Sequence, residues 1–510
     1  MKNEDYALRQ TIFLTGATGL LGQYLLIDLL SKSCQVAVLA RDSRQDRAEE
    51  RIAKIIALWG ERLEKNIPTP VVIAGDLCQK GLGLTTADHN WVGRNCSTVI
   101  HSAASVSFRS NAEGDPWRTN VEGTRSLLEI CQKLGLSEWH QISTAFVCGR
   151  QAGLLTEREL IPKPSFHNPY EESKWHAEQL ARQTRGIQAT IYRPSVIVGD
   201  SRTGYTTSFN GLYHFLEMAV RLAEVHGGLG RTRLPLRLPL CGNEQWNLVP
   251  VDWVSQAIVT LLGRRHWHGC TFHLVSQSPL TTSFIRDVGE SVLNLPGVEF
   301  IGKTIVGQPT RIEQVFMEAI QEYWPYLDGN PVFDSANTQK ALSDLPPPIL
   351  NHAMLERLIH FGVASRWGRT LHVRKKTPES PHPGCAYFME HVFPVRVKKS
   401  GIAAEAGLDL TVSVDLHGPG GGKWSLKWSQ GELVLVTRGI LDGVTIIYHT
   451  DTMTFRDITS GIKSPQEAFF EQRISITGDV ETALKLAVLF GEFLSETNPG
   501  GVTDYSALES

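Results

Sequence analysis

Short apolar runs of β-rich composition alternate with amphipathic helical patterns along the first half of the chain. We predict strands at residues 11–15, 35–40, 71–74, 98–101, 139–144 and 188–192. We predict helices at residues 20–30, 46–59, 122–133 and 170–183. This alternation is typical of βαβ units, whose parallel sheet carries helices on both faces. The pattern therefore predicts an α/β fold with a doubly wound parallel sheet.

The hydrophobic pattern becomes less regular between residues 200 and 365. It predicts an amphipathic helix at 209–223, a strand at 271–275 and a closing helix at 354–361. Residues 365–385 are basic and interrupted by prolines, which is typical of an interdomain linker. We therefore divide the chain into a domain at 1–365, a linker at 366–384 and a second domain at 385–500.

Strand-like and helical runs in the second domain predict an α+β fold. Residues 408–416 alternate between apolar and polar positions in the manner of an edge strand. Further strands are predicted at 423–428, 433–438 and 444–448, and an amphipathic helix at 480–494.

Composition narrows the class of protein without identifying a substrate. With 42% hydrophobic residues, 20% charged residues and a net charge of −3, nothing favours nucleic acid as a partner. The eight cysteines lack the spacings of a metal site or a disulfide framework, so we predict no metal and reduced thiols in the cytoplasm. No apolar run approaches the ~18 residues of a spanning helix, so we expect at most peripheral membrane contact.

A segment rich in glycine joins the first predicted strand to the first predicted helix. It consists of Thr15, Gly16, Ala17, Thr18, Gly19, Leu20, Leu21 and Gly22. Gly16 permits a tight turn, Gly19 permits close approach of a pyrophosphate, and Gly22 permits close packing of helix on strand. The helix N-terminus attracts phosphate charge. The alternative is a plain turn before a helix, but the strand–turn–helix context favours a Rossmann-type dinucleotide site.

Arg41 comes directly after the second predicted strand, where an acidic residue would hold the ribose 2′-hydroxyl of NAD. An arginine there suits the 2′-phosphate of NADP, because a guanidinium binds phosphate bidentately. We therefore predict NADPH in preference to NADH. Two alternatives remain: Arg41 faces solvent, or Asp42 partly restores the acidic function.

Tyr170 and Lys174 are four residues apart on a predicted helix, so they share one face. Asn168 is a suitable N-cap, and Pro169 suits the first helical position. A cation one turn away would lower the pKa of the tyrosine toward a useful range. The alternative is an ordinary surface helix.

These motifs, in this order, resemble the extended short-chain dehydrogenase/reductase family over residues 10–365. The resemblance implies that Asp76 and Leu77 contact adenine, and that Ser102, Ala103 and Ala104 run under the cofactor. It also implies that Pro194 and Val196 lie beside the nicotinamide.

The same resemblance assigns the catalytic residues. Thr144 aligns with the catalytic Ser/Thr, Asn120 with a structural or proton-relay asparagine, and Tyr170 and Lys174 with the proton donor and its partner. Lys174 would also hold the nicotinamide ribose. Within the family, the chain looks closest to fatty acyl-CoA reductases and thioester-reductase domains.

Residues 385–500 resemble a sterol-carrier-protein type 2 domain. The resemblance rests on the segments at 422–428, 451–455 and 464–470. It implies an apolar tunnel for acyl chains or sterols, although the aromatic residues of these segments are equally explained by core packing. We therefore expect a lipid-binding module.

Together these observations predict an NADPH-dependent reductase of a lipid carbonyl. The leading hypothesis is a fatty acyl or polyketide thioester on CoA or an acyl carrier protein, reduced to an aldehyde or alcohol. A hydroxysteroid or β-ketoacyl oxidoreductase is the second hypothesis. The third is a non-catalytic lipid-transfer protein with a nucleotide-sensing domain.

Overall fold

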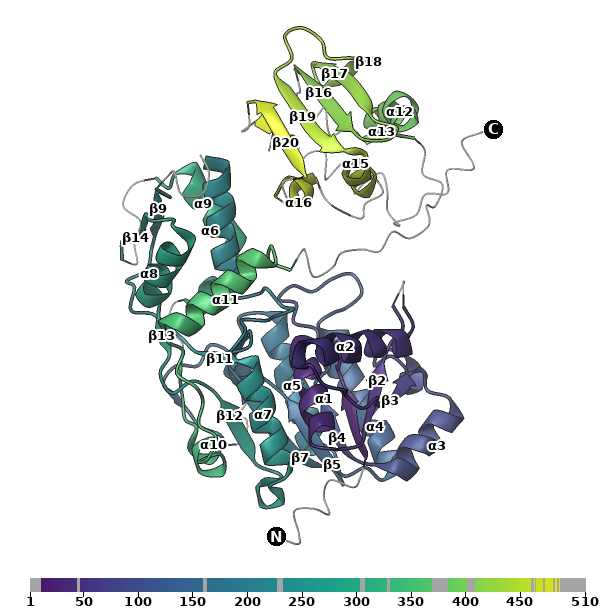
Figure 1. Ribbon diagram of the computed structural model, residues 1–510, viewed down its shortest axis with the longest axis vertical. Helices are drawn as coiled ribbons and strands as arrows, with labels where there is room; N and C mark the ends of the chain where they lie inside the picture. Colours follow the sequence, from purple (N-terminus) through teal and green to yellow (C-terminus); the bar gives the residue numbers. More distant parts are fainter. Residues whose placement is uncertain are drawn as a thin grey trace. The chain divides into compact units, whose positions relative to one another are not determined.

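The computed structural model describes residues 11–43, 46–158, 163–226, 233–302, 308–327, 331–368, 384–400, 409–459, 463, 465–470, 473–479, 482–483 and 486. The chain divides into two compact units, Met1–Val373 and Arg374–Ser510 (Figure 1). Most of the predicted linker, residues 369–383, lies outside the described residues. In the described part of the chain, no helix combines the length and apolarity needed to cross a bilayer.

A seven-stranded parallel sheet forms the centre of the first unit, in the order β12-β7-β5-β4-β1-β2-β3. Its strands are β1 (Thr11–Thr15), β2 (Val36–Ala40), β3 (Val71–Ala74), β4 (Cys96–His101), β5 (Glu138–Ile142), β7 (Gln188–Pro194) and β12 (Thr271–Leu274). The order in which successive strands are added to the sheet reverses between β1 and β4, although these two strands are parallel. At such a point, ligands of doubly wound folds bind outside the carboxyl ends of the strands.

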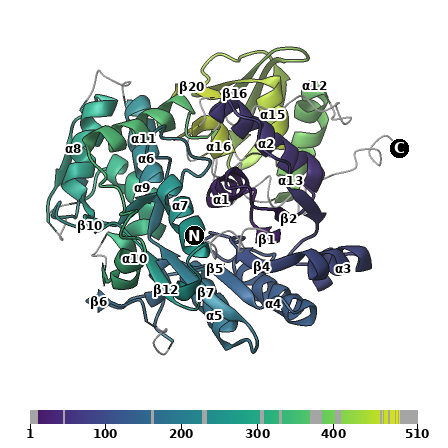
Figure 2. The same cartoon turned by 60° about the horizontal axis from the view of Figure 1, so that its bottom comes forward.

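Helices cover both faces of this sheet (Figures 1 and 2). One layer contains α1 (Leu20–Ser31), α2 (Ala48–Leu63) and α7 (Val251–Leu262). The other contains α3 (Thr86–Asn95), α4 (Gly123–Leu134) and α5 (Pro169–Gln183). The doubly wound fold predicted from the alternating pattern is confirmed.

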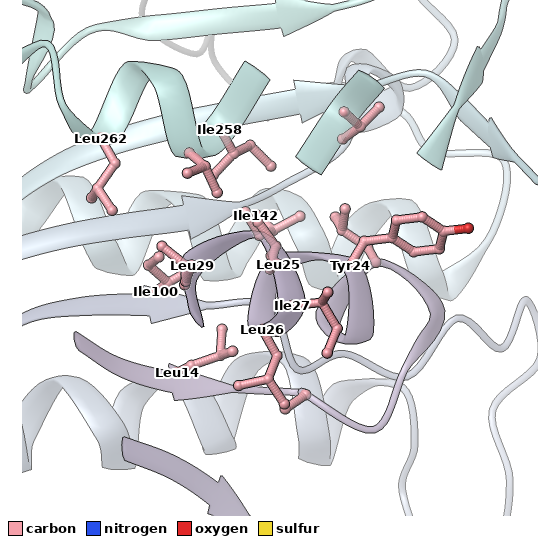
Figure 3. Close-up of a cluster of buried hydrophobic side chains, with 14 of the residues drawn as sticks. Leu14, Tyr24, Leu25, Leu26, Ile27, Leu29, Ile100, Ile142, Ile258 and Leu262 are labelled. Atoms are coloured by element: carbon pink, nitrogen blue, oxygen red, sulfur yellow. The ribbon is translucent and has the colours of Figure 1, made fainter. Parts of the chain in front are cut away.

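Alternate residues of the buried strands pack into different layers, as the pleat requires. Ile12 and Leu14 of β1 belong to the core under α1 and α7, whereas Phe13 between them belongs to the core under α3, α4 and α5. Figure 3 shows Leu14 in one cluster with Leu25, Leu26 and Leu29 of α1. Continuous apolar strands of this kind are therefore buried on both sides.

A smaller lobe is built from segments that follow the main sheet. Its helices are α6 (Leu212–His226), α8 (Thr282–Leu293), α9 (Arg311–Ile320) and α11 (His352–Ala364). Its short strand pairs are β9 (Leu236–Leu238) with β14 (Val298–Phe300), and β10 (Gln245–Trp246) with β13 (Leu280–Thr281). The remaining short elements are β6 (Leu154–Leu155), β8 (Val196–Val198), β11 (Leu248–Pro250), β15 (Val332–Phe333) and α10 (Ala336–Ala341).

The second unit is a mixed five-stranded sheet in the order β18-β17-β16-β19-β20. The strands are β16 (Leu410–His417), β17 (Gly422–Ser429), β18 (Glu432–Arg438), β19 (Ile446–Asp451) and β20 (Ile474–Gly478). Its helices are α12 (Cys385–Tyr387), α13 (Phe393–Ser400), α15 (Thr452–Thr459) and α16 (Pro465–Phe470).

The prediction that residues 408–416 form an edge strand is wrong, because β16 is the middle strand of this sheet. Its alternation separates an apolar face, with Val412 and Leu416 in the core, from a polar face on which Ser413 and Asp415 are nevertheless buried. Alternation records the polarity of the two faces and does not separate central from edge strands. The predicted helix at 480–494 lies almost entirely outside the described residues.

Candidate active site

The glycine-rich turn between β1 and α1 can be built only with glycine at two of its positions. Gly16 has φ +78°, and a Cβ there would lie 2.5 Å from the nitrogen of Ala103. A Cβ on Gly22 would lie 1.9 Å from the carbonyl oxygen of Gly16. At Gly19, in contrast, a Cβ would meet only ordinary contacts. The fold itself does not require glycine at 19. Glycine there permits the protein backbone to approach a ligand closely.

A directed chain of hydrogen bonds ties this turn to the segment after β4. The Ala103 N–H donates to Thr15 Oγ1 (3.2 Å), which lies 2.8 Å from His101 Nδ1. His101 Nε2 lies 2.9 Å from Thr124 Oγ1, and that hydroxyl donates to the carbonyl of Asn120 (2.6 Å). Because each hydroxyl has one proton, Nε2 carries the proton of His101 and Nδ1 accepts from Thr15.

His101 stays neutral in this chain, because burial and the Lys174 charge lower its pKa to about 3. A neutral imidazole is required for the acceptor role of Nδ1. The chain therefore locks Ser102, Ala103 and Ala104 beside the turn at all ordinary pH values.

Thr144 follows the end of β5 and is buried. Its Oγ1 accepts from the N–H of Phe146 (3.3 Å), which caps the 3₁₀ turn Ala145–Cys148. This contact orients the hydroxyl at the carboxyl end of the sheet.

Helix α5 begins as its sequence predicts. Asn168 Oδ1 accepts from the N–H of Glu171 (3.0 Å), and Pro169 occupies the first turn. Lys174 is buried and donates from Nζ to the carbonyl of Ile142 (2.6 Å), at the end of β5. Burial lowers the pKa of Lys174 to about 8, against the opposing effect of Glu178. Lys174 is therefore mostly charged at neutral pH.

The expectation that Lys174 lowers the pKa of Tyr170 is wrong. Burial raises the pKa of Tyr170 to about 12, the Thr144 hydroxyl opposes this shift by hydrogen bonding, and the Glu171 carboxylate adds to it. The lysine is committed to the Ile142 carbonyl. Tyr170 is thus held as a protonated phenol, the form that can donate a proton.

Asn120 lies in a single π-helical turn, Arg118–Glu122, just before α4. Its amide donates to the Ser105 carbonyl and to Ser173 Oγ (both 2.9 Å), and its oxygen accepts from the Ser105 N–H (2.8 Å). This bonding fastens the loop after β4 to α5. The geometry fits the structural role for Asn120 better than the relay role.

A cleft of about 640 Å³ opens at the carboxyl ends of β1, β4, β5 and β7, against the smaller lobe. Thirteen of the predicted site residues line it: Gly16, Thr18, Gly19, Leu20, Leu21, Gly22, Ser102, Ala104, Thr144, Tyr170, Lys174, Pro194 and Val196. The others lie outside its wall: Thr15, Ala17, Arg41, Asp76, Leu77, Ala103 and Asn120. The structure therefore brings together the glycine turn and three of the four predicted catalytic residues.

Arg41 extends from the end of β2 with two-thirds of its side chain exposed, 4.0 Å from Asp76 Oδ2. Asp42 does not share this position, because its Oδ1 accepts from the N–H of Ala48 at the start of α2 (2.8 Å). Arg51 of α2, which the sequence analysis missed, donates to the carbonyl of Arg41 (2.5 Å). Burial and the Arg41 charge lower the pKa of Arg51.

An aromatic wall beside Tyr170 was also missed. The ring centroid of Phe108 lies 6.0 Å from that of Tyr170, 5.3 Å from that of Tyr323 and 5.7 Å from that of Tyr326. The Tyr326 hydroxyl donates to the buried carboxylate of Glu171. Separations of 155 residues leave no local signal for such contacts.

The cleft fits a dinucleotide on features independent of sequence motifs. The space over Gly19 is free, and the helix N-terminus of α1 opens into the cleft. Ser195, between Pro194 and Val196 on the wall, has a buried Oγ without a hydrogen-bond partner among the described residues. A buried orphan hydroxyl in a cleft suits a polar ligand group such as a carboxamide.

Comparison with known proteins places both units in families. Residues 14–258 match the male sterility protein family, and residues 398–491 match the SCP-2 sterol transfer family. Nonribosomal peptide synthetase asaC from Aspergillus flavus is 26% identical over 366 residues, covering 65% of this chain and 34% of the relative. Aldehyde reductase lnaA from the same fungus is 24% identical over 426 residues, which cover 73% of this chain and 37% of that relative. This chain thus spans about a third of the length of each of these two curated relatives.

A solved structure extends the similarity beyond the family match. The crystal structure of the terminal R domain from the myxalamid PKS-NRPS biosynthetic pathway has a TM-score of 0.58 and 27% identity, covering 73% of this chain and 93% of that chain. The chain is therefore an extended short-chain dehydrogenase/reductase domain of the male sterility protein type followed by a domain of the SCP-2 sterol transfer family.

Proposed function

We propose that this protein is an NADPH-dependent reductase of a lipid-like acyl thioester, which it converts to an aldehyde or alcohol. The observation that carries the proposal is the convergence of Thr144, Tyr170 and Lys174 on the cleft that the glycine turn opens. Similarity to a nonribosomal peptide synthetase, an aldehyde reductase and a terminal R domain supports a thioester or aldehyde carbonyl as substrate.

The Gly16–Gly22 turn would hold the pyrophosphate, Lys174 the nicotinamide ribose, and Arg41 with Arg51 the 2′-phosphate. Two guanidinium groups without the competing Asp42 carboxylate favour NADPH over NADH. When bound, NADPH supplies the hydride.

The hydroxyls of Thr144 and Tyr170 would bind and polarise the substrate carbonyl. As the carbonyl carbon accepts hydride, Tyr170 donates its proton to the developing oxyanion, giving a hemithioacetal. The carbon–sulfur bond then breaks as the hydroxyl proton passes to the departing sulfur, which releases the aldehyde and the thiol. The Tyr170 phenolate takes a proton from solvent before the next round. A second round with a second NADPH would give the alcohol.

The SCP-2 domain favours an apolar substrate or product. A tethered lipid-binding module raises the local concentration of its ligand near the reductase. The thiol would be CoA or a carrier protein, and the relative named as a peptide synthetase favours the carrier.

Product identification tests this function. The full chain is incubated with NADPH and, separately, with acyl-CoA, carrier-bound acyl groups and hydroxysteroids or β-ketoacyl compounds. We expect NADPH consumption with aldehyde or alcohol from the thioesters. Turnover of steroids or ketones alone would replace the proposal by the hydroxysteroid or ketoacyl oxidoreductase, and no turnover at all would favour the lipid-transfer protein.

Arg41→Ala is expected to weaken NADPH binding by a factor of about 10–100, since charge-assisted hydrogen bonds contribute about 1.5–3 kcal/mol. NADH binding should not change, because it lacks the 2′-phosphate. Titration of each nucleotide by fluorescence checks both, with Arg94→Ala on α3 as an exposed-arginine control. Equal weakening of both nucleotides would contradict the assignment.

The alkaline limb of kcat/KM is expected near pH 8. The pKa of Lys174 is lowered to about 8 by burial, so its charge is present below that pH and lost above it. Tyr170, with a pKa raised to about 12, stays protonated throughout. The dependence of kcat/KM on pH reports the pKa values of the free enzyme. If kcat/KM does not fall between pH 8 and pH 10, the charge of Lys174 has no role in the reaction.

A further inference from the structure

A second cavity, lined mainly by apolar side chains, lies inside the smaller lobe. It has a volume of about 100 Å³. Its wall includes leucines from β9, α6 and α8, together with Phe300 and Phe316. Apolar cavities of this order stay dry and bind apolar ligands.

The two charged residues at this cavity are already engaged elsewhere. Glu290 accepts from the N–H groups of Gly297 and Val298 (both 2.8 Å). Arg286 stacks 4.7 Å over the ring of Phe300 and pairs with Asp287. The rest of the wall is almost entirely hydrocarbon, and its one buried polar atom without a hydrogen-bond partner among the described residues is the indole nitrogen of Trp246. A charged ligand would therefore lose its hydration without compensation.

Phe215 and Trp246 line this cavity and also line the catalytic cleft. Their rings meet edge to face with centroids 5.0 Å apart. Phe215 further contacts Tyr323, a neighbour of Phe108 in the aromatic wall beside Tyr170. The two rings therefore lie at the boundary between the reaction site and the apolar chamber.

We propose that this chamber binds the distal, methyl end of the substrate acyl chain, with Phe215 and Trp246 as the gate. The inference rests on the proposed thioester reduction and adds its specificity: an unbranched hydrocarbon tail without polar substituents at its end. A short acyl group would end before Phe215 and Trp246, so the chamber would add nothing to its binding affinity.

Calorimetry with unreactive thioethers of pantetheine tests binding apart from turnover, using butyl and decyl chains in the presence of NADP⁺. Ala219→Phe, which fills the chamber from α6, is expected to weaken decyl binding about tenfold or more while butyl binding is unchanged. Leu293→Ala, which enlarges the chamber from α8, should change the ratio of decyl to butyl affinity.

Leu222→Ala is the matched control for Leu293→Ala. Leu222 is buried in the same lobe core on α6 but does not line the chamber, so its loss should lower the melting temperature without altering the preference for chain length. A ratio of decyl to butyl affinity that is the same in wild type, Ala219→Phe and Leu293→Ala would overturn the proposal. If wild type binds by chain length as expected yet reduces no thioester, the proposed function fails and the chamber stands.

Discussion

Replacing Tyr170 with phenylalanine is expected to lower kcat by a factor of about 10²–10⁴, the usual contribution of a positioned general acid. The substitution removes one hydroxyl from the cleft and leaves the half-buried ring in place beside Phe108. Phenylalanine has no ionisable proton, so the proposed donor is missing at every pH. Binding of NADPH should be nearly unchanged.

Single-turnover reduction of an acyl thioester, with NADPH affinity measured in parallel, checks this result. Tyr192→Phe is the matched control for loss of a tyrosine hydroxyl: Tyr192 is fully buried, its hydroxyl lies 2.9 Å from His140 Nδ1, and it does not line the cleft. We expect the control to lose stability and keep its rate. Full activity in Tyr170→Phe would remove the tyrosine from the proposed chemistry.

Glu178→Gln is expected to reduce the free energy of unfolding of the first unit by about 3–5 kcal/mol, the typical cost of breaking a buried ion pair. The Glu178 carboxylate accepts from Arg193 (2.6 and 3.2 Å), from Arg182 (2.9 and 3.1 Å) and from Ser143 Oγ (2.7 Å). Neutralising it leaves the buried guanidinium of Arg193 without its counter-charge.

The destabilisation caused by Glu178→Gln should become smaller as the pH falls. Although burial opposes ionisation, Arg193 leads the interactions that lower the pKa of Glu178 from 4.5 to about 2. Its stabilising contribution is therefore present above pH 4.5 and lost as the pH falls toward 2. Urea unfolding at pH 7 and at lower pH should show the difference between wild type and Glu178→Gln shrinking with acid.

Glu172→Gln is the control for this charge change. Glu172 is on the same helix, but its pair with Lys163 is solvent-exposed and should contribute under about 1 kcal/mol. Equal effects of the two substitutions would mean that burial does not govern the Glu178 network. Because Glu178 holds Ser143, the residue before Thr144, we also expect its loss to impair positioning of the Thr144 hydroxyl.

Local features were predictable because their causes are local. The bounds of β1 and β3 agree with the expected strands, and α5 begins at the Asn168 cap and Pro169. The hydrophobic alternation, the glycine turn and the i, i+4 spacing each need only a few neighbouring residues. The edge assignment of β16 failed because strand order depends on partners elsewhere in the chain.

The sequence by itself determined the doubly wound fold, the need for glycine at 16 and 22, and the residue types of the site. Only the tertiary structure decided the state of Tyr170, whose pKa depends on burial and on Glu171, and the hydrogen bonds that withdraw Asn120 from the cleft. It alone brought Arg51 beside Arg41 and placed an apolar chamber behind Phe215 and Trp246. The physical reason is the same throughout: desolvation and packing are set by residues distant in sequence, whereas turn geometry and helix capping are set by neighbours.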